Sequence, residues 1–151
     1  MQRREFLTTA TALLGALAAA GFLGPEARAE AWNKAAFDAR NLDDLFKVLG
    51  EGGAAESPDV AIVAPDIAEN GAVVPLNVSS AAAKTDAIAV VVEKNPTLLS
   101  AIFFFPQGTL PEVQTRVKMA MTSNVYAIAR CEGGLRYAAK GIKVTLGGCG
   151  G

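Results

Sequence analysis

The sequence predicts a mainly β protein: a β-sandwich that follows an N-terminal helical segment and ends in a flexible, glycine-rich C-terminal arm. Three observations predict this fold. Apolar residues first recur at helical spacing, and after Ser57-Pro58 the chain changes to short β-rich runs separated by turn residues. The chain then ends on four glycines around one cysteine. Several short strands at such spacing favour a sandwich.

The first residues are typical of a secretory signal and not of a folded domain. Arg3 and Arg4 precede an uncharged run over 8–24, and the small-x-small tripeptide Ala27-Arg28-Ala29 suits signal peptidase. The paired arginines and the modest hydrophobicity of the run resemble a twin-arginine signal. The alternative is an uncleaved membrane anchor, for which the run is slightly short. We therefore expect a signal peptide over 1–29, a domain over 30–146 and an arm over 147–151.

The composition excludes several classes of function. Removing the signal takes away three of 14 basic and two of 15 acidic residues, which leaves a net charge near −2. That charge gives no electrostatic case for nucleic acid or an anionic membrane as a partner. The chain has no histidine, so a Ser-His-Asp or Cys-His pair, an imidazole metal site and C-x-x-C-H haem attachment are all excluded. About 120 mature residues make one domain.

Residues 31–50 are predicted to be helical because apolar residues recur there at helical spacing. Asn41 can cap a second helical piece, whose first turn holds Asp43 and Asp44, where acids suit the helix dipole. Gly50 ends the segment. We expect one apolar face of it to pack on the domain.

The rest of the domain is predicted to consist of short strands. Their apolar runs are bounded by turn residues such as Pro65, Asn95-Pro96 and Pro106. The predicted strands are 60–64, 72–78, 87–93, 98–105, 113–121, 125–130, 135–140 and 142–146. Glu132-Gly133-Gly134 is expected to form a hairpin turn between two of them.

The predicted strand through residues 101–105 is apolar on both faces. Successive side chains of a strand point to opposite sides, so Phe103 and Phe105 share one face. Ile102 and Phe104 share the other. A sheet with water on one side should alternate apolar with polar residues. Something therefore covers the second face, either the N-terminal helical segment or a partner subunit.

The C-terminal arm carries the chemistry that the sequence singles out. Glycine explores backbone conformations closed to other residues, so we expect a flexible arm made by Gly147, Gly148, Gly150 and Gly151. Cys149 is three residues beyond Leu146, a reach of roughly 10 Å when extended. A thiol on a thin, mobile arm can enter a deep cleft in another protein, whereas a catalyst needs preorganised groups. We therefore expect Cys149 to be the attachment residue of a carrier that presents its cargo to other proteins.

An intramolecular disulfide between Cys149 and Cys131 is the alternative, because paired cysteines are common in an oxidising compartment. Cys131 directly precedes the predicted turn at 132–134. If residues 135–146 run extended, their far end lies about 36 Å from that turn, whereas a disulfide needs Cα atoms within about 7 Å. We expect no such bridge and assign Cys131 no role.

The ending Val144–Gly151, the twin-arginine signal and the segment Asp66–Pro75 resemble the SoxY family, the substrate carriers of the Sox sulfur-oxidising system. The resemblance runs along essentially the whole mature chain, and the Gly-Gly-Cys-Gly-Gly ending is its most specific feature. It implies a periplasmic, immunoglobulin-like sandwich in a heterodimer with SoxZ, a second small β protein. By matching position, Cys149 is the attachment residue. Cys131 has no counterpart in the family motif, which leaves open a regulatory or intersubunit disulfide.

The resemblance also implies a reaction sequence. The SoxAX cytochrome conjugates thiosulfate to the cysteine, and the SoxB hydrolase releases sulfate. The remaining sulfane sulfur is then oxidised by a sulfane dehydrogenase or passed on. The carrier itself then has no catalytic site, binds no cofactor or metal, and contacts neither nucleic acid nor, after signal cleavage, a membrane. The doubly apolar stretch at 103–105 is compatible with a SoxZ interface.

Two other functions stay open from the residues. The chain could donate sulfur from a C-terminal Gly-Gly thiocarboxylate, with Gly151 as the reactive end, although export separates it from the ATP needed for adenylation. Alternatively, the domain only binds or assembles, the arm is a disordered end, and Cys149 tethers the domain to another chain.

Overall fold

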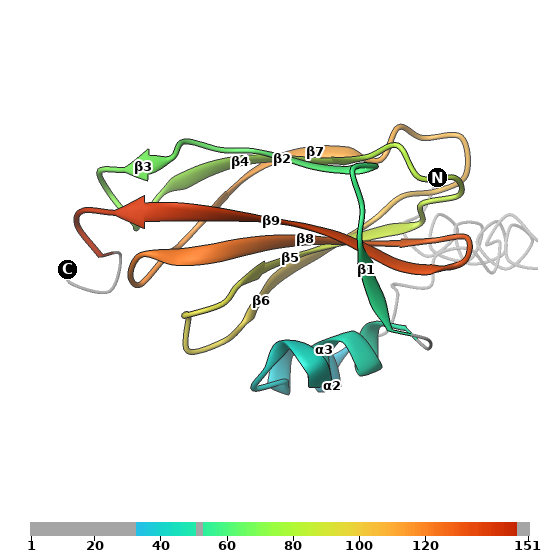
Figure 1. The fold of residues 1–151 in the computed structure, drawn as a ribbon, viewed down its shortest axis with the longest axis horizontal. Helices are drawn as coiled ribbons and strands as arrows, with labels where there is room; N and C mark the ends of the chain where they lie inside the picture. The colour runs from blue at the N-terminus through green and yellow to red at the C-terminus, as the bar shows by residue number, and fades with distance from the viewer. Residues whose placement is uncertain (1–32, 51–52, 148–151) are drawn as a thin grey trace, which may run out of the picture. The chain divides into compact units, whose positions relative to one another are not determined.

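The computed structural model describes residues 33–50 and 53–147. Two helices precede nine strands in this part of the chain (Figure 1). Their bounds are α2 Lys34–Asp38, α3 Leu42–Leu49, β1 Ala54–Glu56, β2 Val60–Val63, β3 Ile67–Ala68, β4 Val74–Ser80, β5 Ala87–Val92, β6 Leu99–Phe104, β7 Glu112–Val117, β8 Ser123–Cys131 and β9 Gly134–Val144. The predicted signal peptide lies outside the described residues.

The strands form two sheets that face one another (Figure 1). The larger has the order β1-β9-β8-β5-β6, with β3 also beside β9, and the smaller has the order β2-β4-β7. β1 and β3 both run parallel to β9, and the other pairs are antiparallel. Apolar side chains from both sheets form the main core. The predicted β-sandwich is therefore confirmed.

β5 is buried along its whole length and divides the hydrophobic core in two. Ile88, Val90 and Val92 belong to the cluster between the sheets. Ala89 and Val91 point the other way, into a second cluster on the outer face of the larger sheet. A strand that is covered on both faces is expected to be apolar throughout. This outer cluster is where the helices pack.

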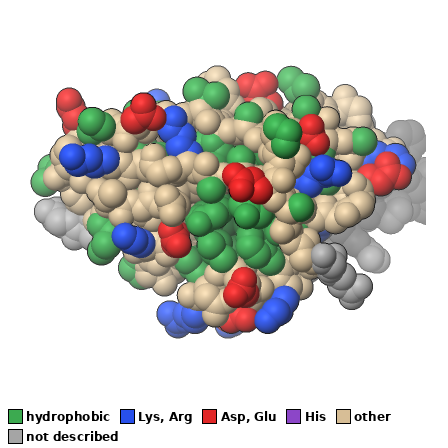
Figure 2. All heavy atoms as spheres, viewed as in Figure 1, with side chains coloured by type: hydrophobic (Ala, Val, Ile, Leu, Met, Phe, Trp, Pro, Cys, Tyr) green, Lys and Arg blue, Asp and Glu red, His purple; other side chains and the backbone are tan. Residues whose placement is uncertain are grey.

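The helices α2 and α3 cover the outer face of the larger sheet (Figure 1). Asn41 caps α3 as predicted, because its Oδ1 accepts a hydrogen bond from the backbone N–H of Asp44 at 2.8 Å. Leu45 is fully buried, and the ring of Phe46 lies 5.6 Å from that of Tyr137 on β9. On the face drawn in Figure 2, hydrophobic side chains gather between the larger sheet and these helices. Among the described residues, no helix has the length and apolar character needed to cross a membrane.

The helices also explain why β6 is apolar on both faces. Phe103 and Phe105 pack against the core between the sheets, and Ile102 packs in the outer cluster beside the helices. The helical segment therefore covers the second face, which confirms one of the two predicted alternatives. Phe104 at the end of β6 remains 43% exposed, with the guanidinium of Arg130 lying 5.9 Å from its ring centroid.

β9 differs from the sequence prediction. The two strands expected at 135–140 and 142–146 are one continuous strand of 11 residues. Gly141 does not interrupt it, because this residue pairs in regular register with Asn124 of β8. The continuous strand carries the chain from one end of the sandwich to the other, where the arm begins.

Three further details of the strand prediction are corrected. β1 and β3 were not predicted, because strands of three and two residues are too short to show periodicity. The strand predicted over 113–121 ends at Val117. Beyond it, the backbone N–H of Met119 leaves the ladder and donates to the carbonyl of Gly71 at 2.7 Å. That hydrogen bond belongs to the site described next.

Candidate functional site at the base of the C-terminal arm

The structure places only the start of the predicted site. Outside the described residues lie Cys149, Gly148, Gly150 and Gly151. Gly147 is the last residue described. We call residues 145–147 the arm base, and the contacts of this segment define where the arm leaves the domain.

One side of the arm base is held by β3 and the residue after it. The backbone N–H of Lys143 donates to the carbonyl of Asp66 at 2.9 Å, and that of Thr145 donates to the carbonyl of Ala68 at 3.1 Å. The hydroxyl Oγ1 of Thr145 also donates to the carbonyl of Glu69 at 3.0 Å. Parallel pairing thus continues past the last residue of β9, and Thr145 is fixed by both its backbone and its side chain.

The other side is held by the loop between β7 and β8. Oγ1 of Thr122 accepts a hydrogen bond from the backbone N–H of Val144 at 3.0 Å, and the same hydroxyl donates to the carbonyl of Val144 at 3.3 Å. A hydroxyl can do both because it carries one donor and two acceptor lone pairs. The pairing of β8 with β9 begins at Ser123 and Ile142, so Val144 has no partner residue in β8. The hydroxyl of Thr122 takes the place of that partner.

Gly71, in the loop between β3 and β4, connects the arm base to the loop between β7 and β8. Its N–H donates to the carbonyl of Leu146 at 2.8 Å, and its own carbonyl accepts from Met119 at 2.7 Å. Asn70 turns the chain towards this position, because its Oδ1 accepts from the backbone N–H of Ala72 at 2.9 Å. Three segments that are distant in sequence are thus joined at one buried glycine.

The position of Gly147 leaves no space for a side chain. A Cβ atom at this position would meet the carbonyl oxygen of Ala120 well inside van der Waals contact. That oxygen belongs to the backbone and cannot swing aside as a side chain would. The sequence prediction treated Gly147 as part of a flexible arm, and the structure adds that this residue rests against the domain. The predicted arm therefore begins at a defined point on the domain.

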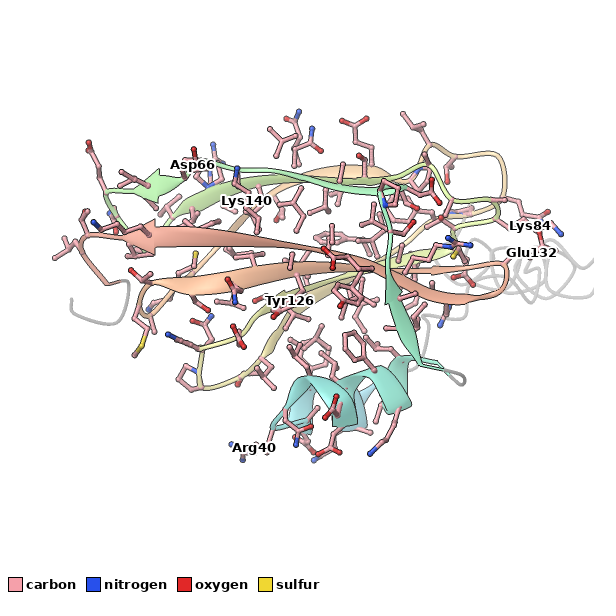
Figure 3. The ribbon with its side chains drawn as sticks, in the orientation of Figure 1. Arg40, Asp66, Lys84, Tyr126, Glu132 and Lys140 are labelled. Atoms are coloured by element: carbon pink, nitrogen blue, oxygen red, sulfur yellow. The ribbon has the colours of Figure 1, made fainter. Side chains whose placement is uncertain are left out.

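An ion pair borders this end of β9. Nζ of Lys140 lies 2.9 Å from Oδ1 of Asp66, and Figure 3 shows the two side chains labelled between β9 and the segment before β3. The carboxylate is largely exposed, so the pair contributes about 1 kcal/mol at most. The hydrogen bonds described above hold the arm base more firmly than this ion pair does.

Cys131, the last residue of β8, lies at the opposite end of β9. Its neighbour Glu132 forms an ion pair with Lys84 at 2.8 Å, and Figure 3 labels both of these residues. It pairs with Gly134 across the two-residue turn, which confirms the predicted hairpin. Its half-buried Sγ donates to the carbonyl of Gly134 at 3.2 Å, and the thiol is free. The 11 residues of β9 place Cys131 about 36 Å from the arm base. This supports the separation on which the disulfide argument rests.

The described residues contain no cluster of three or more His, Cys, Asp or Glu side chains able to hold a metal ion. The pKa of Tyr126 is raised above its usual 10, because burial disfavours the phenolate and the nearby Glu93 carboxylate adds to the effect. Figure 3 shows this tyrosine on the helix side of the larger sheet, and its ring lies 6.0 Å from that of Tyr137. We attribute the shift to packing and not to catalysis.

A shallow groove of about 480 Å³ lies along the smaller sheet. Its lining includes Val63, Pro75, Asn77 and Arg116. Oδ1 of Asn77 is buried without a hydrogen-bond partner, while its Nδ2 donates to Glu112 at 2.9 Å. The lining residues include no thiol, hydroxyl nucleophile paired with a base, or cluster of carboxylates, so we assign this groove no chemical role.

Comparison with known proteins decides the family. The sequence matches the family described as "Sulfur oxidation protein SoxY" over residues 46–149, a stretch that includes Cys149. The chain belongs to the SoxY family. Among solved structures it is similar to that of the sulfur carrier protein SoxY from Chlorobium limicola f thiosulfatophilum, with 34% identity and a TM-score of 0.57. That match covers 62% of this chain and 84% of the Chlorobium chain.

A second solved structure shows that the SoxY sandwich is shared more widely. The superoxide reductase (neelaredoxin) from Ignicoccus hospitalis is 25% identical with a TM-score of 0.51, covering 56% of this chain and 79% of that one. We use this likeness for the fold alone. A search of proteins with curated functions finds no match.

The sequence led us to expect the arm but not the residues that hold its base. Gly71 was covered only by the SoxY-like segment at 66–75, and Thr122 and Ala120 were not singled out. Their role depends on contacts between distant segments; one of these, from Thr145 to Glu69, joins residues 76 positions apart. The one sequence feature that could have pointed to Gly71 is that it is a glycine after an asparagine within the SoxY-like segment at 66–75.

Proposed function

We propose that this protein is a periplasmic carrier, acting in complex with SoxZ, that holds thiosulfate-derived sulfur covalently on Cys149 and presents it to the Sox enzymes. The observation that carries the proposal is the arm base. Cys149 follows, by two residues, a glycine that rests against the domain, and it lies within the stretch that matches the SoxY family.

A short arm on a fixed base suits transfer between enzymes. Two residues beyond Gly147 span about 7 Å when extended, so the thiol searches a small volume around a defined point. A partner that binds the domain therefore meets the thiol at high effective concentration. The glycines keep the arm thin enough for a narrow active-site channel.

The loading reaction joins the sulfur of Cys149 to the outer sulfur of thiosulfate. Forming this S–S bond releases the thiol proton and two electrons, which pass one at a time to oxidised haem of the SoxAX cytochrome. SoxB then uses one water molecule to cleave the bond between the outer sulfur and the sulfonate. Sulfate leaves with the oxygen of that water, and a persulfide remains on Cys149 for oxidation by a sulfane dehydrogenase.

In this scheme the protein is the substrate of the Sox enzymes and not a catalyst. Catalysis needs groups preorganised around the reacting atoms, whereas the proposed arm carries its thiol away from the domain. The partner enzymes then supply the base, the metal or haem and the water-excluding cavity. The sequence has no histidine, which agrees with the partner enzymes supplying the catalytic base.

Intact-protein mass spectrometry without reductant tests the proposal, on protein from cells of the source organism grown on thiosulfate. We expect adducts of sulfur or thiosulfonate size on Cys149, removed by reductant. The Cys149→Ser variant should abolish thiosulfate oxidation, while the matched control Cys131→Ser should retain it. A Cys149→Ser strain that still oxidises thiosulfate overturns the carrier function. A disulfide from Cys149 to another protein favours a tether, and sulfur at the Gly151 carboxylate favours a thiocarboxylate donor.

Export and pairing are tested separately. Replacing Arg3 and Arg4 by lysine should retain the protein in the cytoplasm, as expected for a twin-arginine signal. The secreted wild-type protein should copurify with SoxZ in equal amounts. Unchanged export in the double variant, or wild-type protein free of SoxZ, contradicts the corresponding part of the proposal.

A further inference from the structure

Large hydrophobic side chains are exposed around the arm base. Four of them lie there, namely Ile67 at 57% exposure, Val73 at 53%, Met121 at 54% and Leu146 at 64%. We call these four the collar. Figure 2 shows hydrophobic side chains at the end of the sandwich towards which β9 runs, on the left of the view.

The backbone contacts of the arm base bring the collar together. Leu146 is part of the arm base itself. Ile67 directly precedes Ala68, whose carbonyl accepts from the arm base, and Met121 directly follows Ala120, against which Gly147 rests. Val73 follows Gly71, the residue bonded to Leu146, by two positions. The four collar residues therefore belong to three segments whose backbones meet at the arm base.

The core does not require these side chains. Each is more than half exposed, and the inward-facing residues of the same segments, Ala68, Val74 and Met119, already fill the interior. Loops on a surface are usually polar, and a gathering of exposed apolar groups marks an interaction site more often than isolated ones do. Exposed charges flank the collar at Glu69 and Lys143, the arrangement of an apolar centre with a polar rim.

The length of the arm determines what must cover the collar. Cys149 can extend only about 10 Å beyond Leu146. An enzyme whose reacting group lies inside a channel must therefore bring the entrance of that channel against the residues around Leu146. Those residues are the collar, so the entrance has to present a matching apolar surface.

We propose that the collar is the docking surface for the channel entrance of the enzymes that act on Cys149, with an apolar rim as its partner. This inference rests on the proposed carrier function. Docking there places the arm in line with the channel. The same surface then serves successive enzymes, because each must approach the same short arm.

The test compares three full-length proteins as substrates of a thiosulfate-conjugating enzyme. The collar variant is Ile67→Ser/Val73→Ser/Met121→Ser, which leaves the arm intact. The matched control is Val63→Ser/Leu110→Ser, two residues that are 68% and 74% exposed and belong to neither the collar nor the arm base. The rate of mass gain on Cys149 is measured against carrier concentration. We expect the KM for the collar variant to rise about tenfold with kcat retained, as for loss of interface anchors, and the control to match wild type.

Two further measurements keep the outcome clear. Alkylation by iodoacetamide should proceed at the same rate in all three proteins, because the thiol itself is untouched. The single variant Met121→Ser, in a loop, should show a smaller KM increase even if the triple variant is unstable. A collar variant with wild-type KM overturns docking while leaving the carrier function intact, whereas absence of any mass gain on wild-type Cys149 overturns the carrier function itself. Wild-type self-association that the collar variant loses would assign the surface to a second copy of this chain.

Discussion

Gly147 lies so close to the carbonyl oxygen of Ala120 that a side chain at this position has no room. The contact marks the boundary between domain and predicted arm, because the residues before it are held by hydrogen bonds to two segments, 66–71 and the loop that contains Thr122. Freedom of the arm can begin only after this residue. Gly147 thus has a steric role in the domain, while a flexible arm beyond it stays a prediction from the sequence.

Replacing Gly147 with alanine should destabilise the end of β9. The new methyl group meets a backbone oxygen that cannot rotate away, and overpacking of this kind costs about 1–3 kcal/mol. Urea unfolding of both proteins measures the change. The control is Gly141→Ala on the same strand, where the nearest atom to the new Cβ is Oδ1 of Asn124 at 3.4 Å. Equal stability losses in the two variants would refute the steric argument.

Replacing Thr122 with valine should loosen the last residue of β9. The change removes the hydroxyl that bonds both the N–H and the carbonyl of Val144. Loss of about 1 kcal/mol predicts roughly fivefold faster hydrogen exchange of the Val144 amide, which NMR or mass spectrometry can follow. Thr122→Ser keeps the hydroxyl and should exchange as wild type does. An unchanged rate in the valine variant would show that water replaces the hydroxyl without loss.

Truncating Leu45 to alanine should weaken the packing of the helices on the larger sheet. Leu45 is fully buried in the outer cluster, so we expect a loss of about 2–4 kcal/mol in the free energy of unfolding. Val48 on the same helix is 38% exposed, and Val48→Ala should cost much less. A small effect of Leu45→Ala would mean that the helices contribute little to the stability of the sandwich.

The raised pKa of Tyr126 predicts a loss of stability in alkali. Burial keeps the phenol protonated in the folded protein, so the unfolded chain loses this proton first as the pH passes about 10. The contribution of Tyr126 is complete below that pH and falls as the pH rises towards the folded-state pKa. Unfolding of wild type and Tyr126→Phe from about pH 8 to about pH 11 should show the phenylalanine variant declining less steeply. Parallel declines would contradict the assignment.

The sequence predicted the strands that are long enough for their apolar residues to show a periodic pattern. Eight predicted strands correspond to seven observed ones because β9 is continuous through Gly141, which periodicity reads as a break. The capping role of Asn41 was predictable because the cap and its partner lie within one turn. The covering of β6 was narrowed to two alternatives, and packing of Ile102 beside the helices decided between them.

The contacts of the arm base were beyond the sequence for a physical reason. Gly71, Thr122 and Gly147 belong to three loops or strand ends, and each has an ordinary local role as a turn or tail residue. Their common function arises from hydrogen bonds between segments that have no periodic relationship. Cys149 could be proposed from the sequence because its thiol and its glycine neighbours are contiguous in the chain, and its role stays a prediction.

The joining of three distant segments at Gly71 has a consequence for how the chain matures. Contacts of long sequence separation form late, because loop closure must precede them. The end of β9 and the residue after it bond to partners 22 and 76 residues earlier, so these contacts can form only once the segments around Glu69 and Thr122 are in place. The point from which the predicted arm starts is therefore set by tertiary folding and does not exist in the last residues by themselves.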